Sequence, residues 1–217
     1  MRGGYRIINA LTTDVPFDLQ CPMMSLPQRF GTELASIPAA ARFSIPAALQ
    51  TKWVVRFQKE RTNVGLVWAG NPRHFNDGAR SLPPGHLLPL TRLPGIHCCS
   101  LQVGTAPADV PDGIVDLARE LTDFGETAAV IAALDLIITV DTAVAHLAGS
   151  LGKRVWVLLP YTSDWRWMLD REDSPWYPSM RLFRQKQPGG WDEVVARVVS
   201  ELSSEPAQNA DDQPTPN

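Results

Sequence analysis

The sequence predicts an α/β fold in which a Rossmann-like parallel sheet carries helices on both faces, and three observations lead to this prediction. From residue 64 onward, short apolar segments alternate with segments of helical periodicity, as in successive βαβ units. Several of the short segments are apolar almost throughout, as expected for strands that are covered on both sides. Right-handed crossovers between parallel strands then place helices on both faces of the sheet.

The predicted elements follow one another in a regular order. Strands are expected at residues 64–69, 96–102, 114–117, 136–140 and 154–159, with an edge strand at 180–183. Helices are expected at residues 84–93, 126–134, 142–151 and 191–202. Because ligands of open parallel sheets bind beyond the carboxyl ends of the strands, the residues that directly follow these strands are candidates for a binding site.

The two ends of the chain differ from the central part. Prolines recur at positions 16, 22, 27, 38 and 46, in a stretch without a sustained period of strand or helix. We therefore expect residues 1–52 to be irregular and residues 53–203 to form the α/β domain. Residues 204–217 are polar and contain proline, which predicts a disordered tail.

Length, charge and cysteine pattern exclude several classes of protein. The 217 residues suffice for one α/β domain with additional segments. A net charge of −3 with both signs mixed argues against a nucleic-acid partner. The sequence contains neither a transmembrane segment nor a signal peptide, so a cytoplasmic protein is expected. Three cysteines without framework spacing and four histidines without a metal-binding motif predict no disulfide, metal or other cofactor.

The segment around Asp141 gives the clearest local signal, because it combines a strand, a turn and a helix start. Asp141 ends an apolar run and is a favoured N-cap residue, while Gly152 is well placed to end the helix. The apolar residues at helical spacing, which are expected to face the core, are Val144, Leu147, Ala148 and Leu151. Thr142 and His146 are then expected on the opposite side of the helix.

The first turn of this helix is a candidate site for an anion. The free N–H groups of Ala143 and its neighbours, together with the helix dipole, suit a diphosphate. The Thr142 hydroxyl and the His146 imidazole can add hydrogen bonds, whereas Asp141 would cap or orient because a carboxylate repels phosphate. From the residues alone, a purely structural cap at Asp141 and a packing role for His146 remain open.

The motif D-T-A-V-A-H-L-A-G at 141–149 resembles the D-T-[AG]-x-x-H-L signature of the heptosyltransferase-like glycosyltransferases. Other segments that are similar to this family are 65–82, 100–102 and 121–124. Together they resemble the C-terminal domain found after tetratricopeptide repeats in bacterial proteins, over about residues 15–202. The resemblance implies the C-terminal half of a GT-B fold, with residues 1–52 as a remnant of the N-terminal domain.

The resemblance also implies a binding site for a nucleoside diphosphate sugar. The helix start would hold the diphosphate, and Arg80 stands where the family has a basic residue near the donor phosphates. Gly70 and Asn71 would form a turn that lets the backbone approach the ligand. The implied binding residues are Gly70, Asn71, Arg80, Ser81, Asp123, Asp141, Thr142, Ala143 and His146.

Two segments allow two interpretations each. Asp123 either lies where the nucleoside binds or simply begins the next helix. Residues 163–179, which contain three tryptophans among many charges, either shape a sugar or base pocket or cover the edge of the sheet. The polar loop residues His74, Asn76 and Asp77 are weaker candidates, because such loops are commonly solvated and inert.

The resemblance implies glycosyl transfer from a nucleoside diphosphate sugar to an acceptor hydroxyl. The sequence does not identify a catalytic residue, because GT-B enzymes usually place the base on the N-terminal domain. A protein that supplies this domain is therefore the second expected partner, and a truncated form lacking the acceptor domain is expected. The alternatives are a non-catalytic binding or interaction module and a dinucleotide-dependent oxidoreductase. The oxidoreductase is disfavoured because the G-x-G-x-x-G fingerprint is absent.

Overall fold

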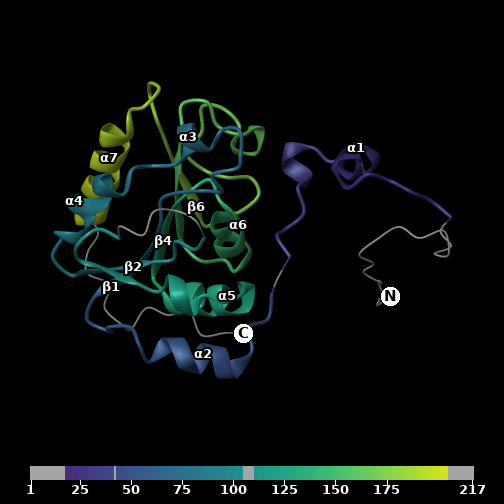
Figure 1. Cartoon of the computed structure of the whole chain (residues 1–217). Coiled ribbons are helices and arrows are strands. Elements are labelled where there is room, and N and C mark those ends of the chain that lie inside the picture. Colours follow the sequence, from purple (N-terminus) through teal and green to yellow (C-terminus); the bar gives the residue numbers. More distant parts are fainter. Residues whose placement is uncertain (1–17, 42, 105–109, 205–217) are drawn as a thin grey trace. The chain divides into compact units, whose positions relative to one another are not determined.

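The structure is a computed structural model and describes residues 18–41, 43–104 and 110–204. The chain divides into two units, Met1–Ile37 and Pro38–Asn217. The described part of the first unit forms only short helical turns without a buried residue: η1 (Met23–Ser25), α1 (Leu26–Arg29) and η2 (Leu34–Ser36). The second unit contains the α/β domain (Figure 1).

The domain is built on a six-stranded parallel sheet with the order β3-β2-β1-β4-β5-β6. The strands are β1 (Thr62–Val67), β2 (Ile96–Ser100), β3 (Ile114–Asp116), β4 (Leu136–Val140), β5 (Val155–Leu159) and β6 (Met180–Arg184). Every predicted strand is present, and the predicted edge strand is confirmed as β6. The order of the strands reverses between β1 and β4, which is where open α/β sheets bind ligands.

Helices cover both faces of this sheet, as predicted (Figure 1). On one face lie α5 (Phe124–Ala133) and α6 (Ala143–Ser150), with α2 (Ala47–Val54) packed against α5. On the other face lie η3 (Pro84–Leu87), α4 (Leu88–Thr91) and α7 (Trp191–Ser204). Single turns in the connecting loops are α3 (Asp77–Arg80), η4 (Ala118–Glu120) and η5 (Trp165–Trp167).

Helix α2 is an element that the sequence pattern did not predict. The side chain of Trp53 is fully buried, and its Nε1 donates to Oε2 of Glu126 on α5 at 2.6 Å. Nζ of Lys52 and Cζ of Arg56 lie 4.8 and 4.6 Å from the centroid of the indole ring. The compact domain therefore begins earlier in the chain than residue 53 and includes part of the segment expected to be irregular.

The predicted helix at residues 84–93 is two shorter elements instead. A 3-10 helix ends at Leu87, and α4 begins at Leu88 with Pro89 in its first turn. Proline has no N–H group and its ring crowds the carbonyl four residues earlier. Pro89 is therefore tolerated at the start of α4 but breaks a continuous helix through this position.

The buried side of α6 also differs from the prediction. The residues of α6 that are buried are Ala145, Ala148 and Gly149. Val144, Leu147 and Leu151, which were expected to form the buried stripe with Ala148, are only half-buried. Small residues let the helix lie close to the sheet. Trp167 and Tyr177, which come later in the chain, pack against its other side. Gly152 ends the helix as predicted, with φ +69°.

Within residues 18–41, 43–104 and 110–204, no helix is long and apolar enough to cross a membrane. Of the predicted disordered tail, Ser204 is the last residue of α7. The rest of that tail lies outside the described residues.

Candidate functional site

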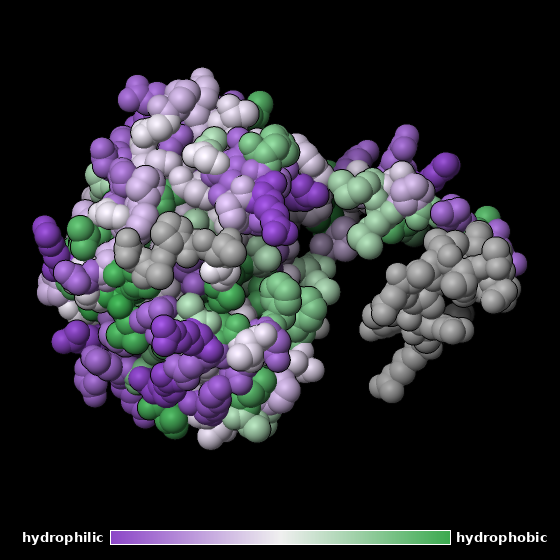
Figure 2. Space-filling model, viewed as in Figure 1, coloured by the Kyte–Doolittle hydropathy of each residue, from purple (hydrophilic) through white to green (hydrophobic). Residues whose placement is uncertain are grey.

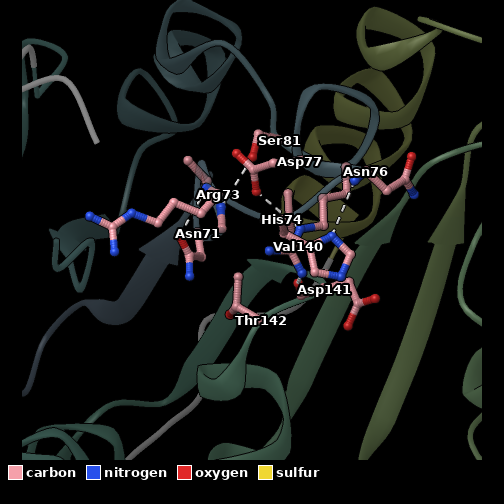
Figure 3. Close-up of polar contacts among 12 residues, drawn as sticks. Asn71, Arg73, His74, Asn76, Asp77, Ser81, Val140, Asp141 and Thr142 are labelled. Atoms are coloured by element: carbon pink, nitrogen blue, oxygen red, sulfur yellow. Dashed lines mark hydrogen bonds and ion pairs between the residues drawn. The ribbon is translucent and has the colours of Figure 1, made fainter. Parts of the chain in front are cut away.

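Most of the predicted site residues gather at the carboxyl ends of β1 and β4, on either side of the point where the strand order reverses. Figure 3 shows Asn71, Asp77 and Ser81, from the loop after β1, together with Asp141 and Thr142, which directly follow β4. The first loop and the helix start, which lie far apart in the sequence, therefore form one polar surface.

Arg80 connects the loop after β1 to the start of α6. Its Nη1 donates to the backbone carbonyl of Asp141 at 3.0 Å, and its Nε donates to Oδ1 of Asp77 at 3.1 Å. The Arg80 side chain is only 14% exposed, which keeps the guanidinium in place. Its Nη2 has no hydrogen-bond acceptor among the described residues. One guanidinium nitrogen therefore remains for a ligand, although Asp77 balances part of the positive charge.

Gly70 makes room for this arrangement. A Cβ atom on Gly70 would lie 2.6 Å from Cζ of Arg80 and 2.6 Å from Oδ1 of Asp77, which is closer than side-chain atoms can approach. The Gly70 N–H donates to Oγ of Ser81 at 3.1 Å, and Oδ1 of Asn71 accepts from the N–H of Arg73 at 3.0 Å. In this structure Gly70, Asn71 and Ser81 therefore shape the loop around Arg80.

Gln102 supports the same loop and was not predicted as a site residue. Its Oε1 accepts from the N–H groups of Trp68 at 3.1 Å and Ala69 at 2.8 Å, and its Nε2 donates to the Ala69 carbonyl at 3.1 Å. These bonds fix the backbone between β1 and Gly70. The signal in the sequence was a polar residue directly after an apolar strand, in the segment S-L-Q.

Helix α6 begins one residue later than predicted, because Thr142 and not Asp141 is its N-cap. Thr142 has an extended backbone, with φ −140° and ψ 171°. Its hydroxyl makes no capping bond and lies 3.0 Å from Oγ1 of Thr139. The N–H of Ala145 donates to the Thr142 carbonyl, whereas those of Ala143 and Val144 have no acceptor within the part of the chain that the structure describes. Two amides at the positive end of the helix dipole thus remain open to an anion.

His146 lies between two aromatic side chains, which fits the packing role that the residues alone left open. Its ring stacks on Trp167, with centroids 5.3 Å apart and planes 16° apart, and its Nδ1 lies 3.2 Å from the Tyr177 hydroxyl oxygen. Burial is the main cause that lowers the pKa of His146 below its ordinary value of 6.5. Trp167 and Tyr177 belong to the segment 163–179, which therefore covers α6 and also touches a candidate site residue.

An apolar cavity of about 440 Å³ adjoins His146. It lies between the first turn of α5 and the middle of α6, and residues just before α2 close its remaining side. Residues that line it include Phe43, Ile45, Phe124, Gly125, His146 and Ser150. A cavity of this size lies in the range typical of small-molecule sites.

Asp123 is the N-cap of α5, in agreement with the interpretation that it begins this helix. Its Oδ1 accepts from the N–H of Glu126 at 2.8 Å, so the carboxylate already has a structural role. The next residue, Phe124, is 66% exposed and lines the cavity. The described residues contain no group of three or more His, Cys, Asp and Glu side chains that could hold a metal ion.

Comparisons with known proteins agree with this architecture. Residues 106–193 match the family model of glycosyltransferase family 9 (heptosyltransferase), which covers α5, α6 and the segment with Tyr177 but not the first loop. The solved structure of the ADP-heptose LPS heptosyltransferase II of E. coli superimposes with a TM-score of 0.55 over 75% of this chain, at 18% sequence identity. The chain contains a heptosyltransferase-like GT-B domain.

The heptosyltransferase-like domain also resembles part of a longer curated protein. Over 153 residues, or 64% of this chain, it is 34% identical to the protein FlbA of Caulobacter vibrioides. The match spans 24% of FlbA, and the structural match spans 52% of the E. coli heptosyltransferase chain. The match to glycosyltransferase family 9 supports a role in glycosyl transfer in general.

Proposed function

We propose that the heptosyltransferase-like domain binds a nucleoside diphosphate sugar and takes part in glycosyl transfer to an acceptor hydroxyl. The observation that carries this proposal is the position of Arg80 against the start of α6, fixed by its bond to the Asp141 carbonyl. A guanidinium nitrogen and the open amides of Ala143 and Val144 lie at the same edge of the sheet. Cationic N–H donors next to a helix N-terminus suit the two negative charges of a diphosphate.

The cavity beside His146 supports a place for the nucleoside. Ala143, at the first turn, and Leu147, which lines the cavity, are about 6 Å apart along the helix axis. A ribose can span such a distance between a diphosphate and a base. The exposed ring of Phe124 and the apolar lining suit a planar base, which gains from stacking and from burial of its faces.

The proposed reaction forms one bond and breaks one. The acceptor oxygen bonds to the anomeric carbon of the sugar, while the bond from that carbon to the diphosphate breaks. The nucleoside diphosphate leaves with the electron pair of this bond, and Arg80 with the open amides would stabilise its developing charge. The proton of the acceptor hydroxyl passes to a general base.

A protein or domain that carries the acceptor site would complete this function. The heptosyltransferase-like domain spans about half of the E. coli heptosyltransferase chain, and GT-B enzymes bind donor and acceptor across two domains. A non-catalytic interaction module is the second candidate, because Phe43 and Phe124 are 55% and 66% exposed at the rim of the cavity. Turnover in the presence of an acceptor-binding domain distinguishes the two functions.

Calorimetric titration with ADP, UDP and GDP tests the donor site. We expect at least one of them to bind with a Kd below about 1 mM, a free energy of about 4 kcal/mol. Replacing Thr142 by Glu puts a negative charge at the helix start, so Thr142→Glu should abolish this binding. Ala143→Glu should do the same, and Ala143 is exposed, so that this change leaves the core untouched.

A matched control adds the same charge elsewhere. Ser203 is exposed in the last turn of α7, which runs back from the carboxyl edge of the sheet, so Ser203→Glu should bind the nucleotide as the wild type does. Circular dichroism confirms that the variants fold. If all three nucleotides fail to bind the wild type, or if Thr142→Glu and Ala143→Glu retain its affinity, the donor site is not at α6.

A further inference from the structure

Tyr177 makes a hydrogen bond to one of the two ring nitrogens of His146, a residue that lines the cavity. The Tyr177 hydroxyl lies 3.2 Å from Nδ1 of His146, and the two rings are 5.8 Å apart between centroids. Nε2 of His146 has no hydrogen-bond partner among the described residues, and the imidazole lines the cavity. One ring nitrogen is therefore held by the protein, and the other remains for a ligand.

Gly149, one turn after His146, lets Tyr177 reach this position. A Cβ on Gly149 would lie 2.6 Å from Cγ of Tyr177, so any larger residue would push the phenol ring away from α6. Trp167 holds the other side of the imidazole, because its indole is 1% exposed and lies nearly parallel to the ring. The imidazole is thus fixed in orientation by contacts on two sides.

We propose that Tyr177 is a positioning residue that donates its hydroxyl proton to Nδ1 of His146, so that the neutral imidazole keeps its own proton on Nε2 and presents it to the bound nucleotide. This inference rests on the proposed donor site. A neutral imidazole has one acceptor and one donor nitrogen, and the partner of one nitrogen sets the role of the other. A phenol that donates to Nδ1 satisfies its own O–H and makes Nε2 a hydrogen-bond donor.

The surroundings of His146 favour the neutral ring that this arrangement requires. Burial is the largest influence and lowers the pKa of His146, and the positive charge of Arg166 lowers it further. The carboxylates of Asp141 and Asp164 act in the opposite direction. Near pH 7 the ring can therefore act as an uncharged donor to a phosphate or ribose oxygen.

Nitrogen NMR of the whole chain tests the proposal directly. With 15N-labelled histidine, the two ring nitrogens of His146 give different chemical shifts according to which one carries the proton. We expect the wild type to carry it on Nε2 at pH 7.5. Tyr177→Phe keeps the ring and removes the hydroxyl, so it should shift the population toward the other tautomer and weaken the best-binding of ADP, UDP and GDP about fivefold.

The control for this substitution is Tyr161→Phe, which removes a phenol hydroxyl from a residue that is 58% exposed. Among the described residues, the hydrogen bond and the ring contacts of His146 involve Trp167 and Tyr177 and not Tyr161. Tyr161→Phe should leave the tautomer and the affinity unchanged. A wild-type His146 protonated on Nδ1, or a Tyr177→Phe variant with unchanged tautomer and affinity, overturns the role of Tyr177. Absence of nucleotide binding in the wild type would instead refute the donor site, while the NMR measurement still decides the tautomer.

Discussion

At the scale of single residues, glycine occupies two positions where the site needs the backbone close to a neighbouring side chain. Gly70 leaves space for the guanidinium of Arg80, and Gly149 leaves space for the ring of Tyr177. Glycine lowers the stability of a helix interior by about 1 kcal/mol relative to alanine. At Gly149 this loss is offset by the packing of Tyr177 and Met180 on α6.

This balance predicts that Gly149→Ala destabilises the domain, although alanine is the better helix former. The new Cβ would lie 2.6 Å from Cγ of Tyr177 and 2.5 Å from Cε of Met180, and overpacking of this kind costs about 1–3 kcal/mol. Urea denaturation measures the effect. Gly78→Ala is the control, because a Cβ at this position meets nothing within 4 Å. This substitution should be neutral or slightly stabilising. Equal stability of the two variants would contradict the packing argument.

At the scale of elements, the sequence predicted those strands and helix ends that are marked by a local pattern of apolar residues or by a glycine. The strands were found because doubly covered strands are apolar throughout, and the end of α6 because Gly152 adopts a positive φ. The helix α2 was missed because its single buried residue, Trp53, leaves no repeating apolar stripe. The N-cap of α6 was misplaced because Asp141 and Thr142 are both good capping residues, and only the folded backbone separates them.

The positions of the candidate site residues were predictable where they depend on strand order. Arg80 and the start of α6 follow strands, so their common position at the sheet edge could be inferred from topology. Trp167 and Tyr177, which enclose His146, come from an irregular segment that has no period to place it against α6. The enclosure of His146 by these two rings was therefore not predicted, because contacts between distant segments are not visible in helical spacing.

Helix α2 should contribute strongly to stability despite its short length. Trp53 is fully buried against α5 and donates to Glu126, so Trp53→Ala should lower the free energy of unfolding by about 3–5 kcal/mol. The neighbouring Val54 is 59% exposed, so Val54→Ala should change the free energy of unfolding by less than about 0.5 kcal/mol. Denaturant unfolding of both variants provides the comparison. A small effect at Trp53 would mean that α2 is not part of the cooperative domain.

At the scale of the whole molecule, all buried apolar residues of the described part of the chain lie in the second unit, Pro38–Asn217. The two core clusters of the described residues, one on each face of the sheet, extend from Trp53 to Leu202. None of the described residues before Pro38 is buried. Figure 2 shows apolar and polar residues interspersed over the visible face of the larger unit. The stability of the fold should therefore reside in the second unit.

A fragment of residues 38–204 should consequently fold like the full chain. It keeps both core clusters, the sheet, α2 and the end of α7, and it loses no residue that is buried in the described structure. Because a loss of 1 kcal/mol lowers the Tm of a domain of this size by about 2–4 °C, we expect the Tm values of fragment and full chain to agree within about 2 °C. Differential scanning calorimetry measures both. A fragment starting at residue 56 is the control, since it lacks α2 and Trp53 and should melt well below the other two. If the 38–204 fragment melts as low as this control, residues before Pro38 support the core.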